Sequence, residues 1–232
     1  MKIDETPRVA ASPRESSFWF RVGSISAILL GLGYIVIIPL YAHVGAPPNG
    51  GQAWFLYLPG KTSFWWAIIA LSVLTDMLYI PIALALYLAL ERLSKNTMLL
   101  AVAFMGLFVV LDLAITWPHF TSILVLYRQY LAATSDIQRQ GFLAAANYGS
   151  AVLNSPLEAV YAIVTLSTGI LLAGLVMLRG VFDKPTAWLA IATGVFGIAA
   201  PTGLGIAVYG NALLATIWLF FVGYRLHRLA QA

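Results

Sequence analysis

Long apolar stretches, separated by short polar or turn-forming segments, run through most of this chain. A helix that crosses a bilayer needs about 20 predominantly apolar residues. The pattern therefore predicts an all-α polytopic membrane protein with six transmembrane helices, at residues 22–44, 63–90, 97–117, 156–178, 186–200 and 204–224. The fifth stretch is short, and only the turn-like Pro201-Thr202-Gly203 separates it from the sixth, so a single re-entrant hairpin is the alternative there.

Two of the segments between the predicted spans have patterns of their own. Residues 45–61 are rich in Pro and Gly and end in an apolar run, 54–58, which we expect on the outer membrane interface. In the longer segment, 118–155, Ser135 and Gln138 have capping-box spacing, and helix-forming residues follow from 136 to 152. We therefore predict a short outer helix between the third and fourth spans, which either covers a cavity as a lid or rests on the membrane surface.

The distribution of basic residues indicates the orientation. With the N-terminus inside, one side of the membrane receives Lys2, Arg8, Arg14, Arg21, Arg92, Lys95, Arg179, Lys184, Arg225 and Arg228, and the other receives Lys61, Arg128 and Arg139. Because Lys and Arg concentrate in cytoplasmic loops, both termini are predicted to be cytoplasmic, as in a multi-pass protein of the inner (plasma) membrane. Tryptophans near the predicted span ends indicate an aromatic belt: Trp19, Trp54, Trp65, Trp66, Trp117 and Trp188.

The polar N-terminal segment lacks the apolar core and the cleavage site of a signal peptide. We therefore expect residues 1–20 to be a disordered cytoplasmic tail and residues 21–228 to be one six-helix transmembrane bundle.

The composition agrees with this class of protein. The chain has 232 residues, of which 61% are hydrophobic and only 9% are charged, and its mean hydropathy is +0.87. Soluble domains carry about 25% charged residues, so the main partner is the lipid bilayer. The net charge of +4 comes from residues at helix ends rather than from one patch, so no nucleic-acid partner is expected. The absence of cysteine excludes disulfides, thiolate nucleophiles and Cys-ligated metals.

Three carboxylates, Asp76, Asp112 and Glu158, lie inside apolar stretches that contain no Lys or Arg to pair with them. An unpaired acid in hydrocarbon costs a few kcal/mol or more, so intramembrane acids are candidate functional groups by default. Asp76 follows Ser63 by 13 residues, or roughly 20 Å of helix, which places it near the bilayer centre. Ser72 and Tyr79 share its helix face and could donate hydrogen bonds. The other interpretation of Asp76 is a neutral or hydrogen-bonded acid that holds helices together.

Asp112 is followed by Thr116 and His119 on the same predicted helix face, although Pro118 makes the position of His119 uncertain. An acid and a histidine on one face could relay protons or supply two metal ligands. Since no tight His-x-x-x-His or Glu-x-x-His spacing accompanies them, neither a metal site nor a cofactor is predicted. Alternatively, His119 simply lies at the wet interface.

Glu158 and Asn211 have ordinary structural interpretations. Ser155-Pro156-Leu157-Glu158 fits the start of a helix, in which Ser155 is the N-cap and Glu158 meets the positive helix end. Asn154 and Tyr161 lie on the same face as Glu158 and keep a functional role open. Asn211, an amide in the sixth span, is expected to form a hydrogen bond between helices. All four lysines lie outside the predicted spans, which argues against a retinal Schiff base.

The chain resembles the uncharacterised bacterial membrane family known as domain of unknown function 4386. The resemblance covers roughly residues 20–200 and rests on three stretches: the run Pro81-Ile82-Ala83-Leu84-Ala85-Leu86-Tyr87-Leu88-Ala89-Leu90, the run Tyr130-Leu131-Ala132-Ala133-Thr134 leading to Arg139, and Val176-Met177-Leu178-Arg179-Gly180-Val181-Phe182 with residues 187–197 after it. It implies a multi-helix bacterial membrane protein and supplies no activity.

Three functions fit these observations. The leading hypothesis is a bundle with a polar, outward-open cavity around Asp76 and Asp112 that binds or moves a small solute, with proton coupling as one form of it. The second is an intramembrane enzyme that uses a protonated carboxylic acid on a lipid or isoprenoid substrate, in a cavity shaped for a long chain. The third is a structural or sensory protein in which both acids are fully hydrogen-bonded and no cavity lies beside them.

Overall fold

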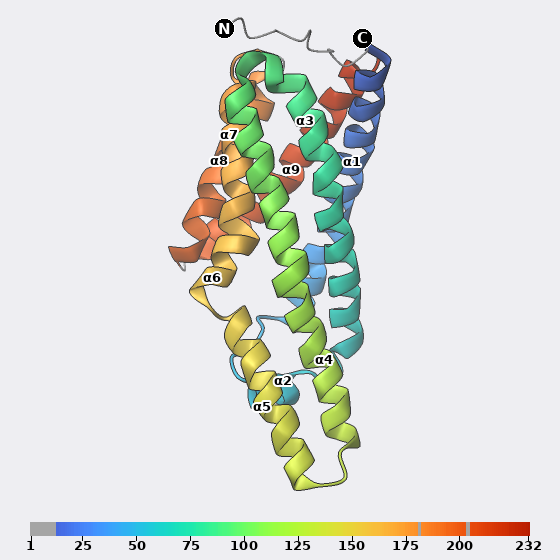
Figure 1. Cartoon of the computed structure of the whole chain (residues 1–232), viewed down its shortest axis with the longest axis vertical. Helices are drawn as coiled ribbons and strands as arrows, with labels where there is room; N and C mark the ends of the chain where they lie inside the picture. The colour runs from blue at the N-terminus through green and yellow to red at the C-terminus, as the bar shows by residue number, and fades with distance from the viewer. Residues whose placement is uncertain (1–12, 181, 203–204) are drawn as a thin grey trace, which may run out of the picture.

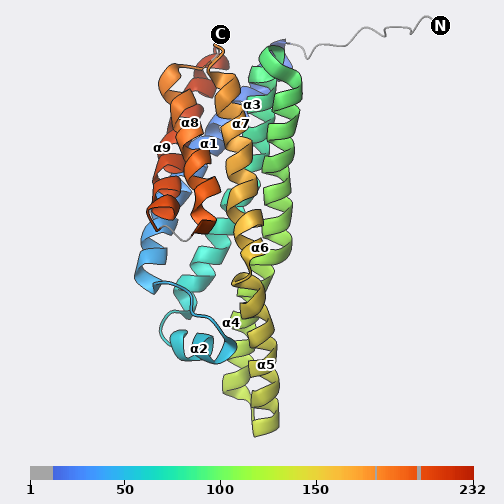
Figure 2. The same ribbon diagram turned by 90° about the vertical axis from the view of Figure 1, so that its left-hand side faces the viewer.

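In the computed structural model, which describes residues 13–180, 182–202 and 205–232, the chain folds into a helical bundle with a smaller helical extension at one end (Figures 1 and 2). The bundle consists of α1 (Pro13–Val44), α3 (Thr62–Leu111), α7 (Thr165–Met177), α8 (Lys184–Ala199) and α9 (Gly205–Leu229). The extension, which we call the cap, consists of α2 (Gly51–Tyr57), α4 (Trp117–Ala132) and α5 (Asp136–Leu153). A short helix, α6 (Pro156–Ala159), leads back from the cap into α7, and the part of the chain that the structure describes contains no strand.

Five helical stretches among the described residues are long and apolar enough to cross a membrane: Ser16–Val44, Thr62–Ala132, Pro156–Met177, Lys184–Thr202 and Ala207–Leu229. The all-helical, membrane-type architecture predicted from the sequence is therefore confirmed. The helix α1 begins at Pro13 and so extends into the predicted tail, residues 1–20, of which 1–12 lie outside the described residues. The turn after the fifth predicted span includes residues 203 and 204, which are also outside them.

The second predicted span and most of the third form the single element α3, which folds back on itself, and the helical chain continues without a break beyond Leu111. Ser94, within α3, has non-helical backbone angles (φ −162°, ψ 85°), and the ribbon of α3 reverses direction along its length (Figure 1). Tyr79 and Phe108 lie on opposite sides of this bend, and their ring centroids are 5.6 Å apart, a contact that a straight helix could not make. The two legs of α3 therefore lie side by side in the bundle.

Small residues bring α1 and α9 close together at the end of the bundle that carries the chain termini (Figure 2). Ser24 donates a hydrogen bond from Oγ to the carbonyl oxygen of Gly223 at 2.7 Å. A Cβ on Gly223 would lie 2.9 Å from Cγ1 of Ile28, and a Cβ on Gly31 would lie 3.0 Å from the ring of Phe220. Such close packing replaces the hydrophobic effect as the main attraction between helices in lipid.

The cap contains the helix predicted after Ser135. The Oγ of Ser135 accepts a hydrogen bond from the backbone N–H of Gln138 at 3.3 Å, which confirms the predicted N-cap. The side chain of Gln138 reaches back to the N–H of Thr134 at 3.2 Å, one residue earlier than in a standard capping box. The helix α5 also supplies a hydrogen-bond acceptor for the start of α2, since Gly51 donates its backbone N–H to Oδ1 of Asn147 at 2.6 Å.

The apolar run 54–58, predicted to lie on the outer interface, is largely buried instead. Trp54, Phe55 and Leu58 are at most 6% exposed, and of the large apolar side chains in the run only Leu56 points outward, at 76% exposed. Tyr57 donates a hydrogen bond from its hydroxyl to the carbonyl oxygen of Val44 at 2.9 Å. Burial raises the pKa of the Tyr57 phenol, so the hydroxyl keeps its proton for this bond. The cap is thus attached to the end of α1.

Three tryptophans assigned to the aromatic belt are also buried, so the prediction was wrong for them. Trp65 is fully buried, Trp54 is 1% exposed and Trp117 is 8% exposed. They pack around Phe120, which stacks on Trp65 (centroids 5.0 Å apart) and on Trp117 (5.7 Å apart). Aromatic rings near the end of a span can pack against either lipid or other aromatic rings. Here they pack against one another and form the core between the bundle and the cap.

We expect Ser135→Ala to destabilise α5 by about 1 kcal/mol, because the first turn loses the acceptor for the N–H of Gln138. Amide hydrogen exchange should become faster in the first turns of α5 and stay unchanged in α1. The matched control is Ser63→Ala, which removes an exposed hydroxyl in the first turn of α3. Equal protection of α5 in the two variants would contradict the cap.

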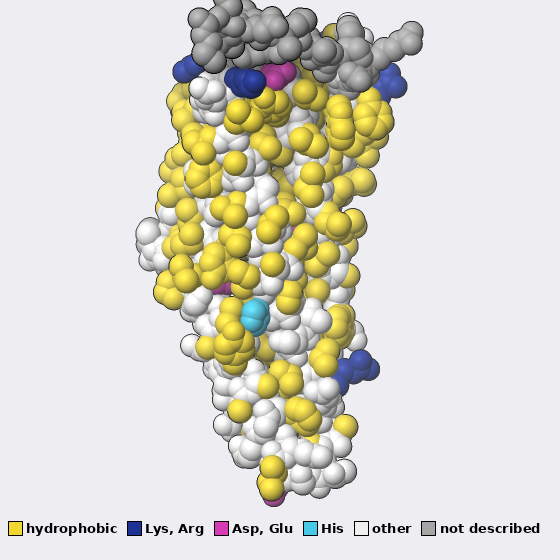
Figure 3. Space-filling view, in the orientation of Figure 1, with side chains coloured by type: hydrophobic (Ala, Val, Ile, Leu, Met, Phe, Trp, Pro, Cys, Tyr) yellow, Lys and Arg dark blue, Asp and Glu magenta, His cyan; other side chains and the backbone are white. Residues whose placement is uncertain are grey.

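Hydrophobic side chains cover most of the flank of the bundle, whereas the cap is more polar (Figure 3). In this view most of the Lys and Arg side chains lie at the end that carries the termini. Apolar side chains that face outward along the helices include Ile35 at 52% exposed and Val110 at 63% exposed. A surface of this kind suits hydrocarbon rather than water.

Candidate functional site

Asp76, on the first leg of α3, and Asp112, directly after the second leg, come together. Both side chains belong to residues that are 4% exposed, and both line the same cavity. The indole Nε1 of Trp117 donates a hydrogen bond to Oδ2 of Asp76 at 2.6 Å. Asp112 is close enough to Asp76 to interact with it electrostatically. Bringing two acids together without a basic partner is expensive in a low-dielectric environment, so this arrangement calls for a physical reason.

A π-helical turn, η1 (Asp112–Thr116), places Trp117 beside the acids. The backbone N–H of Trp117 bonds to the carbonyl oxygen of Asp112, five residues earlier, instead of to the carbonyl four residues earlier. The next residue, Pro118, has no N–H and disfavours regular α-helical bonding in the preceding turn. Trp117, the first residue after η1, therefore lies one turn beyond Asp112, in the place that Thr116 would hold in an α-helix.

Glu158 approaches the same group of acids from α6. Ser155 caps this helix as predicted, since its Oγ accepts a hydrogen bond from the N–H of Glu158 at 3.3 Å. The Glu158 carboxyl group is close enough to interact with Asp112 and Thr116. A second π-helical turn, η2 (Val160–Val164), follows α6 and packs against η1. Two π turns on neighbouring segments thus lie at the level of the acids, and such turns are frequent at functional sites.

The cavity beside the two aspartates has a volume of about 200 Å³, and we call it the acid cavity. Its walls come from α1, both legs of α3, η1, the start of α4, η2, α7 and α9. The residues that line it are Tyr34, Ile37, Tyr41, Ser72, Thr75, Asp76, Phe108, Asp112, Trp117, Ala162, Ile163, Leu166, Ser167 and Asn211.

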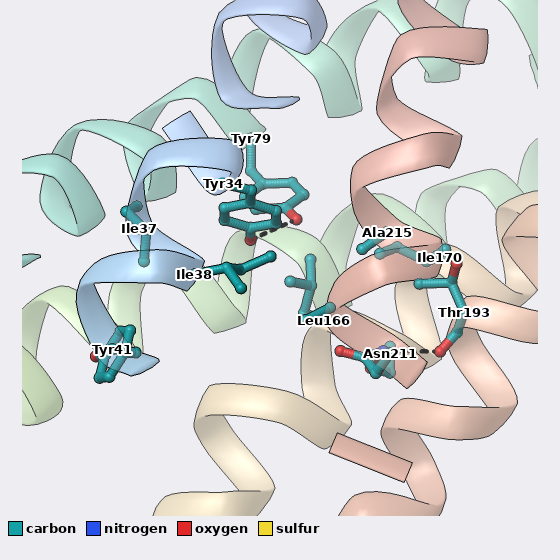
Figure 4. Close-up of a pocket in the computed structure, with 12 residues that line it drawn as sticks. Tyr34, Ile37, Ile38, Tyr41, Tyr79, Leu166, Ile170, Thr193, Asn211 and Ala215 are labelled. Atoms are coloured by element: carbon teal, nitrogen blue, oxygen red, sulfur yellow. Dashed lines mark hydrogen bonds between the residues drawn. The ribbon is translucent and has the colours of Figure 1, made fainter. Parts of the chain in front are cut away.

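A second cavity, also of about 200 Å³, adjoins the first, and we call it the apolar cavity. It shares six lining residues with the acid cavity and adds Ile38, Tyr79, Ile170, Thr193, Ala212 and Ala215. Figure 4 shows Tyr34 and Tyr79 side by side in its wall, where their hydroxyl groups form a hydrogen bond of 3.0 Å. Apart from this pair, Ser167, Thr193 and Asn211, the wall is built from aliphatic side chains and from Tyr41.

Asn211 lies where the two cavities meet. Its amide Nδ2 donates to the carbonyl oxygen of Thr193 at 2.8 Å (Figure 4) and lies 3.5 Å from Oγ of Ser167. These contacts join α9 to α8 and α7, as expected for an amide in a span. The arrangement needs Gly197, because a Cβ there would overlap Oγ of Ser167 and lie 2.6 Å from Nδ2 of Asn211.

Several buried polar atoms around the cavities have no hydrogen-bond partner among the described residues. They are Oδ1 of Asp112, Oγ1 of Thr116 and Oγ1 of Thr193. The three residues are between 0% and 4% exposed. Because buried polar atoms are almost always paired in folded proteins, these atoms indicate a site that water or a ligand completes.

His119 is not among the residues lining either cavity. Its Nδ1 lies 2.6 Å from the carbonyl oxygen of Ile115, and its ring packs near Tyr148. The predicted shared face with Asp112 assumed an uninterrupted α-helix, whereas the extra residue of η1 rotates all later positions by roughly 100°. Within the described part of the chain, no three His, Asp or Glu side chains are placed to hold a metal ion.

The sequence interpretation missed Trp117, Tyr34 and Tyr41 as residues of the site. Trp117 was assigned to the membrane interface, and the two tyrosines lie in an apolar stretch without any charged neighbour. A helical-wheel comparison of the first span could have found Tyr34 and Tyr41, since they are seven residues apart and so share a face. Nothing in the sequence signals the position of Trp117, because it depends on the π turn.

Chemically, the two cavities can hold a small molecule that has a polar end and an apolar end. The carboxyl groups can accept hydrogen bonds or exchange protons, and the tyrosine hydroxyls can donate or accept. Comparison with known proteins adds no assignment. The chain matches no family model, no curated protein and no solved structure. The resemblance to domain of unknown function 4386 therefore stays a prediction.

Proposed function

We propose that this protein binds a small solute in the joined acid and apolar cavities and moves it across a membrane. The observation that carries the proposal is the pair of buried aspartates beside a cavity, where Oδ1 of Asp112 has no hydrogen-bond partner in the part of the chain that the structure describes. Carboxyl groups in this position can bind solute and protons in turn, as proton-linked transport requires.

The main alternative without a ligand is that the acids only hold helices together. That interpretation requires both carboxyl groups to be fully hydrogen-bonded and tightly packed. The Trp117–Asp76 bond fits it, but the unpaired Asp112 oxygen and the open volume beside it do not. These two features support solute binding.

The alternative of a lipid- or isoprenoid-processing enzyme requires room for a long chain. Each of the two cavities has a volume of about 200 Å³. An apolar cavity of about 150 Å³ is filled by a molecule the size of benzene. A molecule that fills these cavities is therefore about the size of one or two benzene rings, which favours a small solute over an isoprenoid.

The proposal places six crossings in the membrane, because the first leg of α3 is long enough for one and the second leg is long enough together with η1, which continues it. It also places the terminal end in the cytoplasm of a bacterial cell and the cap outside. The excess of Lys and Arg at the terminal end supports this orientation.

The test is a solute screen on the purified protein in lipid nanodiscs, read out as the temperature of unfolding. The panel contains four classes of small solute: amines, carboxylates, alcohols and sugars. We expect one class to raise this temperature in the wild type and to lose the effect in the double variant Asp76→Asn, Asp112→Asn, because a ligand stabilises only the state that binds it. A hit is then tested for uptake into proteoliposomes that contain a pH-sensitive dye. No shift with any class, or equal shifts in the wild type and the variant, would reject the proposal.

A further inference from the structure

We propose that the ligand of this site is a small amphiphilic organic cation, with an ammonium group in the acid cavity and an apolar body in the apolar cavity. The inference rests on the proposed function and goes beyond it by naming the chemical class. It follows from three features of the two cavities: the sign of their charge, the nature of their walls and their size.

The charge of the site favours a cation. Of the described residues that line the two cavities, two are acids and none is Lys, Arg or His. The indole N–H of Trp117 donates a hydrogen bond to Oδ2 of Asp76, whereas Oδ1 of Asp112 is buried and has no partner among the described residues. An ammonium group carries donors only, so it complements an unpaired carboxylate oxygen, whereas a carboxylate ligand would meet like charge.

The hydroxyl groups of the site give a second, independent indication of a ligand. Oγ1 of Thr193 is completely buried, lines the apolar cavity and has no partner among the described residues. Oγ1 of Thr116, which follows Asp112 on η1 but lines neither cavity, is 3% exposed and also has no partner among the described residues. Unpaired polar groups of this kind are rare unless water or a ligand satisfies them. Each cavity is therefore lined by one buried polar atom without a partner among the described residues, Oδ1 of Asp112 in the acid cavity and Oγ1 of Thr193 in the apolar cavity.

The walls favour a cation with an apolar body. The aromatic side chains of Tyr34, Tyr41, Phe108 and Trp117 surround the acid cavity, and aromatic faces attract ammonium groups. Beyond them, Ile38, Ile170, Ala212 and Ala215 make the far wall aliphatic. Each cavity has a volume of about 200 Å³, and a cavity of about 150 Å³ already holds a molecule the size of benzene, so one ring fits the apolar cavity and a short linker with its ammonium group fits the acid cavity.

The experiment measures the binding of three molecules of nearly equal shape to the protein in nanodiscs: 2-phenylethylamine, 2-phenylethanol and 3-phenylpropionate. We expect the amine to bind at least about tenfold more tightly than the alcohol, as a hydrogen bond to a charged group predicts, and the carboxylate not to bind. A series of ethylamine, butylamine and hexylamine should gain about fourfold in affinity for each added methylene group.

The variant Ala215→Leu fills part of the apolar cavity and tests the second half of the inference. It should flatten the alkylamine series while leaving the preference for an amine over an alcohol unchanged. The control is Ala103→Leu, which adds the same side chain on the exposed surface of α3. A buried alanine such as Ala27 would not serve, because it lies in the tightly packed core. Tighter binding of the alcohol or the carboxylate than of the amine would overturn the cation assignment and leave solute binding intact. Binding of no molecule here and none in the wider solute screen would reject both proposals.

Discussion

Asp112→Asn is expected to lower the affinity of the site for 2-phenylethylamine by about 30-fold. The change removes the charge that the ammonium group would meet, and a hydrogen bond to a charged group is worth about 2 kcal/mol. The fold should survive, because Oδ1 of Asp112 makes no bond among the described residues and asparagine has nearly the same shape. Isothermal titration of the protein in nanodiscs measures the affinity, and the unfolding temperature reports the stability.

The matched control is Asp136→Asn, the same chemical change at a residue whose side chain is 94% exposed in the cap. Its ion pair with Arg139, at 3.6 Å, lies on the surface, so its loss should matter little. Equal affinities for the amine in Asp112→Asn and the wild type would show that Asp112 does not hold the ligand. A large fall in the unfolding temperature of Asp112→Asn alone would instead indicate a structural role.

Gly197→Ala should destabilise the protein by about 1–3 kcal/mol, because a Cβ in this position overlaps the side chain of Ser167. The same Cβ lies 2.6 Å from Nδ2 of Asn211, so α8 must move away from α7 and α9. Since Ser167 and Asn211 line both cavities, the displacement should also weaken ligand binding. The unfolding temperature and the affinity for 2-phenylethylamine should therefore both decrease.

Gly106→Ala provides the comparison, since a Cβ on Gly106 would meet nothing within 4 Å. There the added methyl group should leave stability unchanged or raise it slightly, because alanine is the better helix former. If the two variants unfold at the same temperature, α7, α8 and α9 are not packed as closely at Gly197 as the structure indicates.

The sequence was sufficient to predict the helices and several of their ends. The spacing of Ser135 and Gln138 and the Ser-Pro-Leu-Glu motif at Ser155 identified the starts of α5 and α6, because capping depends on local chemistry. The reversal at Ser94 agrees with the two predicted spans on either side of it. The burial of α2 could not be predicted, since an apolar run near a span end fits a lipid surface and a protein core equally well.

The site was predictable only as far as polar residues stand out in apolar stretches. Asp76, Asp112, Tyr79 and Asn211 do so, and the structure brings them to two adjoining cavities. His119 was grouped with Asp112 from α-helical spacing, which the π turn η1 invalidates. The same turn brings Trp117 to Asp76. The one extra residue in this turn therefore explains both why His119 was wrongly included in the site and why Trp117 was missed.

The fold-back of α3 has a consequence for the way this protein enters the membrane. Asp76, Asp112 and Trp117 all lie on the two legs of one hairpin and the turn that continues it, within a single uninterrupted segment of the chain. They can meet as soon as that hairpin has been synthesised, before α7, α8 and α9 follow. A hairpin that inserts as a unit shields each carboxyl group from lipid with the other leg, so neither acid has to cross the hydrocarbon alone.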